Sequence, residues 1–380
     1  MEFRDLKRQY ARHKTEINSC IQNVLMSSNF IGGEVVKRLE ERLADYVGVS
    51  HCITCANGTD ALLIALLTWG ISKGDAVFVP DFTFFSTAEV VPWVNATPVF
   101  VDIDKDTFNI SPMALERAIQ YVQEETKLIP KVVIAVDLFG QPADFPEIKK
   151  ITEKYGLLLL EDGAQGFGGA IGEQRACSFG DISTTSFFPA KPLGCYGDGG
   201  AVFTNNDEWN EKIRSLCVHG KGADKYENIR IGMNSRLDTL QAAVLLEKLN
   251  FFAEEVEKCN QIAKEYTSRL SGYVKTPVIK KSMFSSWAQY TICFHNYKER
   301  ENAIKVLKED SIPSAVYYKK PMHLQKAFDT YELKGLEYAV TEDVCNQCLS
   351  LPIHAYLYME DIQYVTNRLL TFIETNAKRM

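Results

Sequence analysis

Short, almost wholly apolar runs recur along the first half of the chain, and they constrain its fold more than any other feature. They cover residues 76–80, 97–104, 131–140 and 156–162, and turn-forming residues bound each one. Strands buried on both faces of a parallel sheet read as continuous apolar runs. Helical patterns lie between them, such as 34–48 and the buried segment 60–70, which ends at a plausible C-cap, Gly70. This alternation predicts an α/β sheet covered by helices on both sides.

The pattern changes near residue 250, where longer amphipathic segments take over. Residues 250–270, 301–310 and 359–374 read as helices, and residues 287–295 read as a strand. We therefore expect two domains, a large α/β domain over 1–250 and a small C-terminal α+β domain over 251–380.

Composition excludes several classes of function. The formal net charge is −7, which argues against general affinity for nucleic acid or an anionic membrane. The longest apolar run, residues 61–71, is about half of the roughly 20 residues that a membrane-spanning helix needs. The N-terminus is charged, unlike a signal peptide. We expect a cytoplasmic protein whose ten cysteines are reduced thiols.

Two cysteine pairs, Cys52/Cys55 and Cys345/Cys348, have a spacing that also occurs in zinc sites. The first pair lies in a strand-like run, whose alternation would point the two side chains to opposite faces. Neither pair has the glycines or basic residues usual in zinc ribbons, so we predict no metal site.

Three segments that follow strands carry candidate site residues, because ligands of open α/β sheets bind at the carboxyl ends of strands. The first is residues 57–60. Gly58 permits a tight turn there, and the N–H groups of Thr59 and Asp60 would open a helix and attract a phosphate. An ordinary helix cap explains the same residues.

The second segment ends a wholly apolar strand at Asp162. A carboxylate at that position is costly to bury unless a cation pairs with it, although it could instead cap the next turn. Gln165, three residues later, could reach the same ligand.

The third segment places Lys191 between two prolines and before a glycine-rich stretch. A residue before proline avoids the helical region, and glycines let the chain turn closely around a flat or bulky group. Ser186 supplies a hydroxyl nearby. An exposed lysine in a surface loop is the alternative.

Together the three segments fit pyridoxal 5′-phosphate. A lysine forms a Schiff base with its aldehyde, an acid keeps its ring nitrogen protonated, and a helix start anchors its phosphate. Phe84 follows another strand end and could stack on the ring, or could be a core residue.

The same residues lie in motifs that resemble the DegT/StrS-type sugar aminotransferases. The motifs include NGTDALLIAL, VPDFTFFSTA, EDGAQGFGG, SFFPAKPLGCYGDGG and NSRLDTLQAAVL, and the likeness runs from about residue 3 to residue 370. The resemblance implies a fold-type I, aspartate aminotransferase-like enzyme and an obligate homodimer with shared active sites. It assigns Lys191 as the Schiff-base lysine and proton shuttle, and Asp162 as the partner of the ring nitrogen. The cofactor positions that it implies are Gly58, Thr59, Phe84, Gln165, Ser186 and, from the partner subunit, Asn234.

The resemblance also implies a substrate class, a keto sugar nucleotide aminated with L-glutamate. The motifs are most similar to UDP-2-acetamido-2-deoxy-3-oxo-D-glucuronate aminotransferases, which serve bacterial surface polysaccharides such as lipopolysaccharide O-antigen. The substrate-binding positions are then Arg236, Tyr317, Tyr318 and His323. Tyr317 replaces a histidine common in relatives, and Gly163 replaces a common alanine.

Several alternatives stay open at this point. The substrate could be a 4-keto UDP-sugar or a 3-keto-6-deoxy dTDP-sugar. A dehydratase branch of the family has histidine where this chain has Lys191, which favours transamination here. A cofactor-binding regulator without turnover is the non-enzyme alternative.

Overall fold

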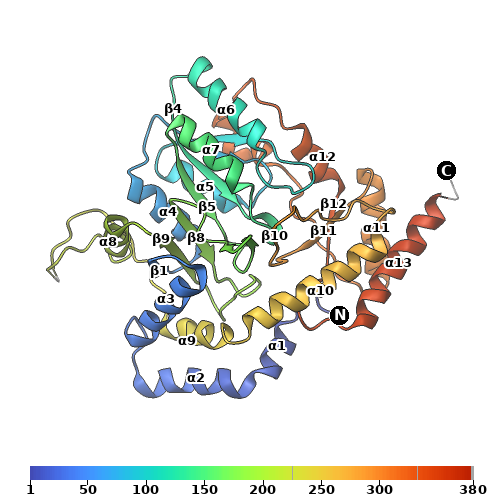
Figure 1. Cartoon of the computed structure of the whole chain (residues 1–380), viewed down its shortest axis with the longest axis horizontal. Helices are drawn as coiled ribbons and strands as arrows, with labels where there is room; N and C mark the ends of the chain where they lie inside the picture. Colours follow the sequence, from blue (N-terminus) through green and yellow to red (C-terminus); the bar gives the residue numbers. More distant parts are fainter. Residues whose placement is uncertain (225, 332, 378–380) are drawn as a thin grey trace.

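A seven-stranded sheet forms the centre of the molecule (Figure 1). The computed structural model describes residues 1–377 apart from 225 and 332. The strand order is β1-β9-β8-β5-β4-β2-β3, and only β9 runs antiparallel to its neighbours among the described pairs. This confirms the predicted mainly parallel α/β sheet. The strands are β1 (His51–Cys55), β2 (Asp75–Pro80), β3 (Thr97–Val101), β4 (Ile129–Val136), β5 (Leu158–Asp162), β8 (Ile182–Ser186) and β9 (Gly200–Thr204).

Helices cover both faces of this sheet, because alternate strand residues feed different apolar clusters. In β2, Val77 and Val79 pack on one side with α4, α5 and α8, whereas Ala76 and Phe78 pack on the other with α6 and α7. The helices α3 and α9 cover the β1–β9 end of the second face. Their bounds are α3 (Glu34–Val47), α4 (Gly58–Trp69), α5 (Phe85–Trp93), α6 (Pro112–Glu125), α7 (Phe145–Tyr155), α8 (Asp207–Leu216) and α9 (Thr239–Lys248).

Two details of the sequence prediction are confirmed at residue level. Gly70 ends α4 in the left-handed conformation, with φ at 71°, as expected of a C-cap. Cys52 and Cys55 enter two different apolar clusters, as the strand alternation predicted.

The C-terminal part has its own apolar cluster, which draws its members from residues 259–369. It forms around a two-stranded antiparallel sheet of β11 and β12. A three-stranded sheet, however, pairs β10 with β6 from the first half of the chain. The division at residue 250 stays a prediction. The elements are β6 (Ala170–Ile171), β7 (Gln174–Arg175), α10 (Phe252–Leu270), β10 (Met283–Phe284), β11 (Tyr290–Cys293), α11 (Tyr297–Glu309), α12 (Ala339–Gln347), β12 (Cys348–Leu351) and α13 (Met359–Ala377).

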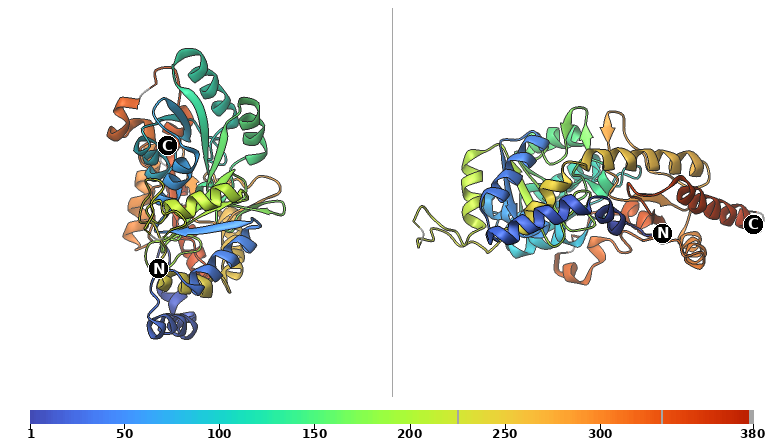
Figure 2. Two further views of the ribbon diagram at one scale, coloured as in Figure 1. Left: turned by 90° about the vertical axis from the view of Figure 1, so that its left-hand side faces the viewer. Right: turned by 90° about the horizontal axis from the view of Figure 1, so that it is seen from below.

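Two segments extend from the body of the molecule. The N-terminal helices α1 (Leu6–Arg12) and α2 (Lys14–Ser27) run along the α9 and α10 side. The connection between α8 and α9 projects far from the sheet in both Figure 1 and the right-hand view of Figure 2. Three short 3-10 turns complete the elements of the described residues: Leu138–Gly140, Met322–Leu324 and Lys326–Tyr331. Within the described residues, no helix has the length and apolarity to cross a membrane.

Candidate active site

A cavity of about 670 Å³ lies where several strands of the main sheet end. Its volume falls in the range typical of small-molecule sites. Most of the predicted site residues line it, although they lie far apart in the sequence, from position 58 to position 318: Gly58, Thr59, Phe84, Asp162, Gln165, Ser186, Lys191, Tyr317 and Tyr318. The fold therefore brings the three candidate segments together around one space.

Asp162 is the last residue of β5, and it is buried in the wall of the cavity. Its Oδ2 accepts a hydrogen bond from Thr87 Oγ1 at 2.8 Å, and its Oδ1 accepts one from the Ala164 N–H at 3.2 Å. Burial raises the pKa of Asp162, while these hydrogen bonds and the charge of Lys191 act in the opposite direction. A cation brought into the cavity would complete this environment and favour the ionised carboxylate.

Lys191 lies in a turn after β8, in which its N–H donates to the Phe188 carbonyl at 2.8 Å. Burial lowers the pKa of Lys191, Asp162 raises it, and Arg4 lowers it, with a net decrease from the ordinary lysine value. A lowered pKa increases the fraction of neutral amine, which is the nucleophilic and basic form.

The start of α4 forms a close-fitting cradle beside this lysine. Asn57 caps the helix by accepting from the Asp60 N–H at 2.8 Å. A Cβ added at Gly58 would lie 2.7 Å from Ser186 Cβ, so a side chain at Gly58 would displace Ser186. The residues Gly58, Thr59 and Ser186 all line the cavity, and the first N–H groups of a helix attract anions.

Gln165 and Tyr318 form one connected wall of the cavity. Gln165 accepts from the Phe139 N–H at 2.9 Å through Oε1, and its amide donates to Tyr318 Oη at 3.0 Å. The Phe84 ring lies 6.4 Å from the Tyr318 ring, and Phe84 is 52% exposed and lines the cavity. The predicted roles of these side chains stay predictions.

The arrangement fits pyridoxal 5′-phosphate on three independent observations. The cradle at Gly58 has no room for a Cβ, Asp162 is a buried carboxylate, and Lys191 is the one lysine or arginine that lines the cavity among the described residues. These features match the phosphate, the protonated ring nitrogen and the aldehyde of that cofactor.

Two threonines of this cavity were not predicted from the sequence. Thr83 and Thr87 both line it, and their hydroxyls are 2.9 Å apart. Thr87 in turn holds Asp162, which lies 75 positions away in the sequence. Two threonines four positions apart, shortly after a strand, are the signal in the sequence, but this spacing does not reveal the contact with Asp162.

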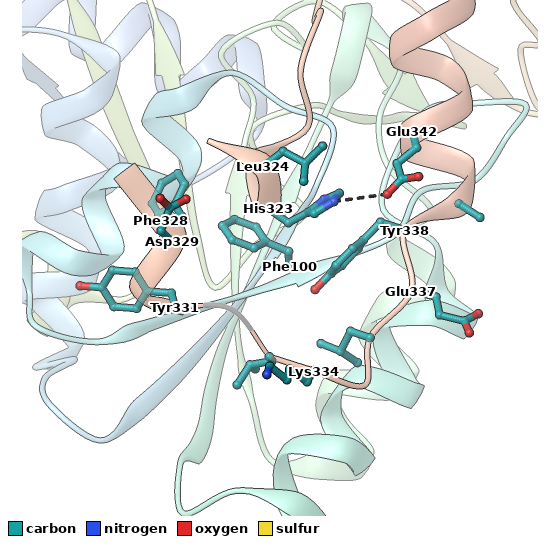
Figure 3. A pocket seen from close by; sticks show the side chains of 13 residues that line it. Phe100, His323, Leu324, Phe328, Asp329, Tyr331, Lys334, Glu337, Tyr338 and Glu342 are labelled. Carbon is teal, nitrogen blue, oxygen red and sulfur yellow. Dashed lines mark ion pairs between the residues drawn. The ribbon is translucent and has the colours of Figure 1, made fainter. Parts of the chain in front are cut away.

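Three predicted residues lie outside this cavity. Asn234 and Arg236 are exposed and belong to the connection between α8 and α9. His323 lines a second cavity, of about 640 Å³, together with residues of the 324–342 segment (Figure 3).

His323 is held between two carboxylates in the second cavity. Its Nδ1 lies 2.6 Å from Oδ2 of the buried Asp81, and its Nε2 lies 3.4 Å from Glu342 Oε1, which Figure 3 marks. Burial lowers the pKa of His323, but the two carboxylates outweigh this effect and the pKa is raised. The ring also stacks on Tyr338, with centroids 4.3 Å apart. These contacts tie His323 to the end of β2 rather than to Lys191.

The DegT/DnrJ/EryC1/StrS aminotransferase family model matches residues 11–370 of the chain. The protein belongs to this family. It is therefore an aminotransferase, and pyridoxal 5′-phosphate is its cofactor, as the sequence predicted. Sugar nucleotide amination is the activity found in the family.

Named relatives match this family member over almost its whole length. UDP-2-acetamido-2-deoxy-3-oxo-D-glucuronate aminotransferase of Pseudomonas aeruginosa is 45% identical over 96% of this chain and 98% of its own. A pleiotropic regulatory protein of Geobacillus stearothermophilus is 40% identical over 97% of both chains.

Solved structures confirm the fold class. A DegT DnrJ EryC1 StrS aminotransferase from Brucella abortus is 46% identical, with a TM-score of 0.96 over 98% of this chain and 99% of its own. The NtdA protein of Bacillus subtilis, crystallised with the cofactor PMP, is 29% identical, with a TM-score of 0.87 over 98% of this chain and 83% of its own.

Proposed function

We propose that the protein transfers the amino group of L-glutamate to the 3-keto group of UDP-2-acetamido-2-deoxy-3-oxo-D-glucuronate, for bacterial surface polysaccharide such as lipopolysaccharide O-antigen. The main support for transamination is that Lys191, Asp162 and the Gly58 cradle line one cavity. The 45% identity to the Pseudomonas aeruginosa enzyme supports the choice of sugar.

The chain's own residues divide the work of binding and proton transfer. With the cofactor bound, Gly58, Thr59 and Ser186 would bind its phosphate, and Asp162 would hold the proton on its ring nitrogen. Phe84 would pack on the ring, and Gln165 would bind the phenolic oxygen. The bound cofactor supplies an electron sink for the carbanion at the reacting carbon.

Lys191 performs the proton transfer. With the cofactor bound, its Nζ would accept the proton from Cα of the amino donor in the first half of the cycle. The lowered pKa of Lys191 suits this task, because the neutral amine accepts the proton. In the second half the same Nζ would donate a proton to C3 of the sugar.

We also propose a homodimer that shares its active sites. L-Glutamate, the uronate and the UDP moiety are anionic, yet Lys191 is the one lysine or arginine that lines the cavity in the described part of the chain. The projecting connection carries Asn234 and, two positions later, Arg236, and it also exposes Ile229 (55%) and Ile231 (94%). Exposed apolar residues of this kind mark an interaction surface. In a dimer, this segment would supply the missing polar and basic groups to the partner's cavity.

A panel of keto sugar nucleotides tests the substrate. We expect amination of the 3-keto uronate with L-glutamate, and transfer to a 4-keto UDP-sugar or a 3-keto-6-deoxy dTDP-sugar with much higher efficiency would reject the proposed sugar. Release of water from the sugar without gain of nitrogen would instead identify a dehydratase.

The regulatory alternative has its own test, since one relative is named a pleiotropic regulatory protein. Adding L-glutamate to the coloured holoprotein, without any sugar, should bleach the visible band and release 2-oxoglutarate. A holoprotein that keeps its band under these conditions would act as a cofactor-binding regulator.

A further inference from the structure

The N-terminal segment before α1 reaches the loop that carries Lys191. Arg4 Nη2 donates to the Lys191 carbonyl at 2.9 Å and lies 3.5 Å from the Pro192 carbonyl. The two partners are 187 positions apart in the sequence. Arg4 therefore binds the backbone carbonyl of Lys191 itself.

Neighbouring contacts hold this segment in place. Asp5 is buried and caps α1 by accepting from the Arg8 N–H at 2.9 Å. The ring of Phe3 lies 6.3 Å from that of Tyr317, which lines the Lys191 cavity. On the other side, the Glu2 carbonyl lies 3.3 Å from His354 Nε2. Arg4 thus extends from an anchored backbone rather than from a free terminus.

A second cation supports the same loop. Lys248, at the end of α9, is 2% exposed and donates to the Gly194 carbonyl at 2.7 Å. Its ammonium group also lies 4.4 Å from the centre of the Tyr196 ring. Arg4 and Lys248 bind carbonyls only two or three residues apart, so two positively charged side chains fix the backbone of the lysine loop.

The charges that face Lys191 come from different elements. Asp162, from β5, favours the protonated amine, whereas Arg4 disfavours it. Other titratable groups line the same cavity: Asp198, Tyr317 and Tyr318. Removing Arg4 would remove a positive charge that lowers the pKa of Lys191, while Asp162 would still raise it. The amine of Lys191 would therefore protonate more readily.

We propose that Arg4 is a positioning residue for Lys191, which fixes the backbone of the lysine loop and places a second positive charge beside the lysine. This inference rests on the proposed role of Lys191 in binding the cofactor. It adds to that role a group from the N-terminal segment, outside the cavity wall.

Capture of pyridoxal 5′-phosphate by the apoprotein tests the inference without turnover. The neutral amine attacks the aldehyde carbon, a C=N bond forms and one water leaves, so the rate follows the unprotonated fraction of Lys191. Borohydride added at timed intervals reduces the C=N bond and makes the adduct stable. Mass spectrometry then measures the fraction of the Lys191 peptide that carries the reduced cofactor at each pH.

We expect Arg4→Leu to move the pH profile of capture to higher pH and to slow capture at neutral pH by about tenfold or more, because a charge-assisted hydrogen bond and a repelling charge are both lost. Arg4→Gln, which keeps a donor but no charge, should shift the profile in the same direction. Arg4→Lys keeps the charge and should hold the profile near that of the wild type.

Arg8→Leu is the control, since Arg8 lies four residues later, in α1, and also donates to a backbone carbonyl, that of Tyr356 at 2.9 Å, while its ion pair is with Asp5 and not with the lysine loop. A wild-type profile in both Arg4→Leu and Arg4→Gln would overturn the inference, as would an equal shift in Arg8→Leu. If the reduced adduct is found on a different lysine of the wild type, the role of Lys191 fails instead. If Arg4→Leu does not fold, the pair Arg4→Gln and Arg4→Lys decides the matter.

Discussion

The hydrogen bond from Thr87 to Asp162 gives a prediction whose size follows from the structure. Thr87→Val keeps the shape of the side chain but removes the hydroxyl that lies 2.8 Å from Asp162 Oδ2. Both side chains are buried, with 1% of Thr87 and 4% of Asp162 exposed, so bulk water has little access to the place of the lost donor. Hydrogen bonds to charged groups contribute about 1.5–3 kcal/mol, which corresponds to a factor of about 10–150.

We expect kcat/KM of Thr87→Val to fall by about that factor of 10–150. The hydrogen bond lowers the pKa of Asp162, so its loss raises that pKa. The carboxylate then protonates at higher pH, and the acid limb of the activity profile moves to higher pH. Steady-state kinetics across a pH series and titration of the cofactor by its visible absorbance measure both effects.

Two further threonine variants make the prediction sharp. Thr87→Ser keeps the hydroxyl and should retain most of the activity and the wild-type pH profile. Thr83→Val removes a neutral hydroxyl that contacts only the Thr87 hydroxyl among the interactions described here, and should lose no more than about tenfold. Wild-type kinetics in Thr87→Val, or a larger loss in Thr83→Val, would refute the reasoning.

Three other predictions concern the cofactor site. Lys191→Ala should abolish turnover while the cofactor still binds, and normal steady-state turnover in this variant would reject its assignment. Burial raises the pKa of Asp162 in the folded apoprotein, so stability present at low pH is lost as pH rises through that pKa. Urea unfolding of apo Asp162→Asn should lack this loss, and a wild type that gains stability relative to the variant with rising pH would contradict it. Gly58→Ala should weaken cofactor binding by about tenfold or more in an absorbance titration, because its Cβ would lie 2.7 Å from Ser186 Cβ; unchanged affinity would show that the cradle tolerates a side chain.

The sequence was sufficient to predict the elements and the residues at strand ends. The apolar runs became β2, β3, β4 and β5, because burial on both faces leaves a pattern within each run. Asp162 and Lys191 were found for a similar reason: a carboxylate after a buried strand and a lysine between prolines are local features.

Contacts between distant segments could not be predicted. Thr87 holds a carboxylate 75 positions away, and Arg4 binds a carbonyl 187 positions away. The glycines after Lys191 were expected to free the backbone for turns. None of them has a positive φ; Gly194 and Gly200 instead allow backbone segments to approach, since a Cβ at Gly200 would lie 2.5 Å from the Asn57 carbonyl carbon. Such close approaches depend on the packed structure.

Borohydride reduction of the holoprotein, followed by peptide mapping, tests the central claim most directly. We predict that the reduced cofactor is found on the peptide that contains Lys191, in stoichiometric amount, and that prior addition of L-glutamate prevents this labelling. Labelling of another lysine, or labelling that L-glutamate leaves unchanged, would contradict the account.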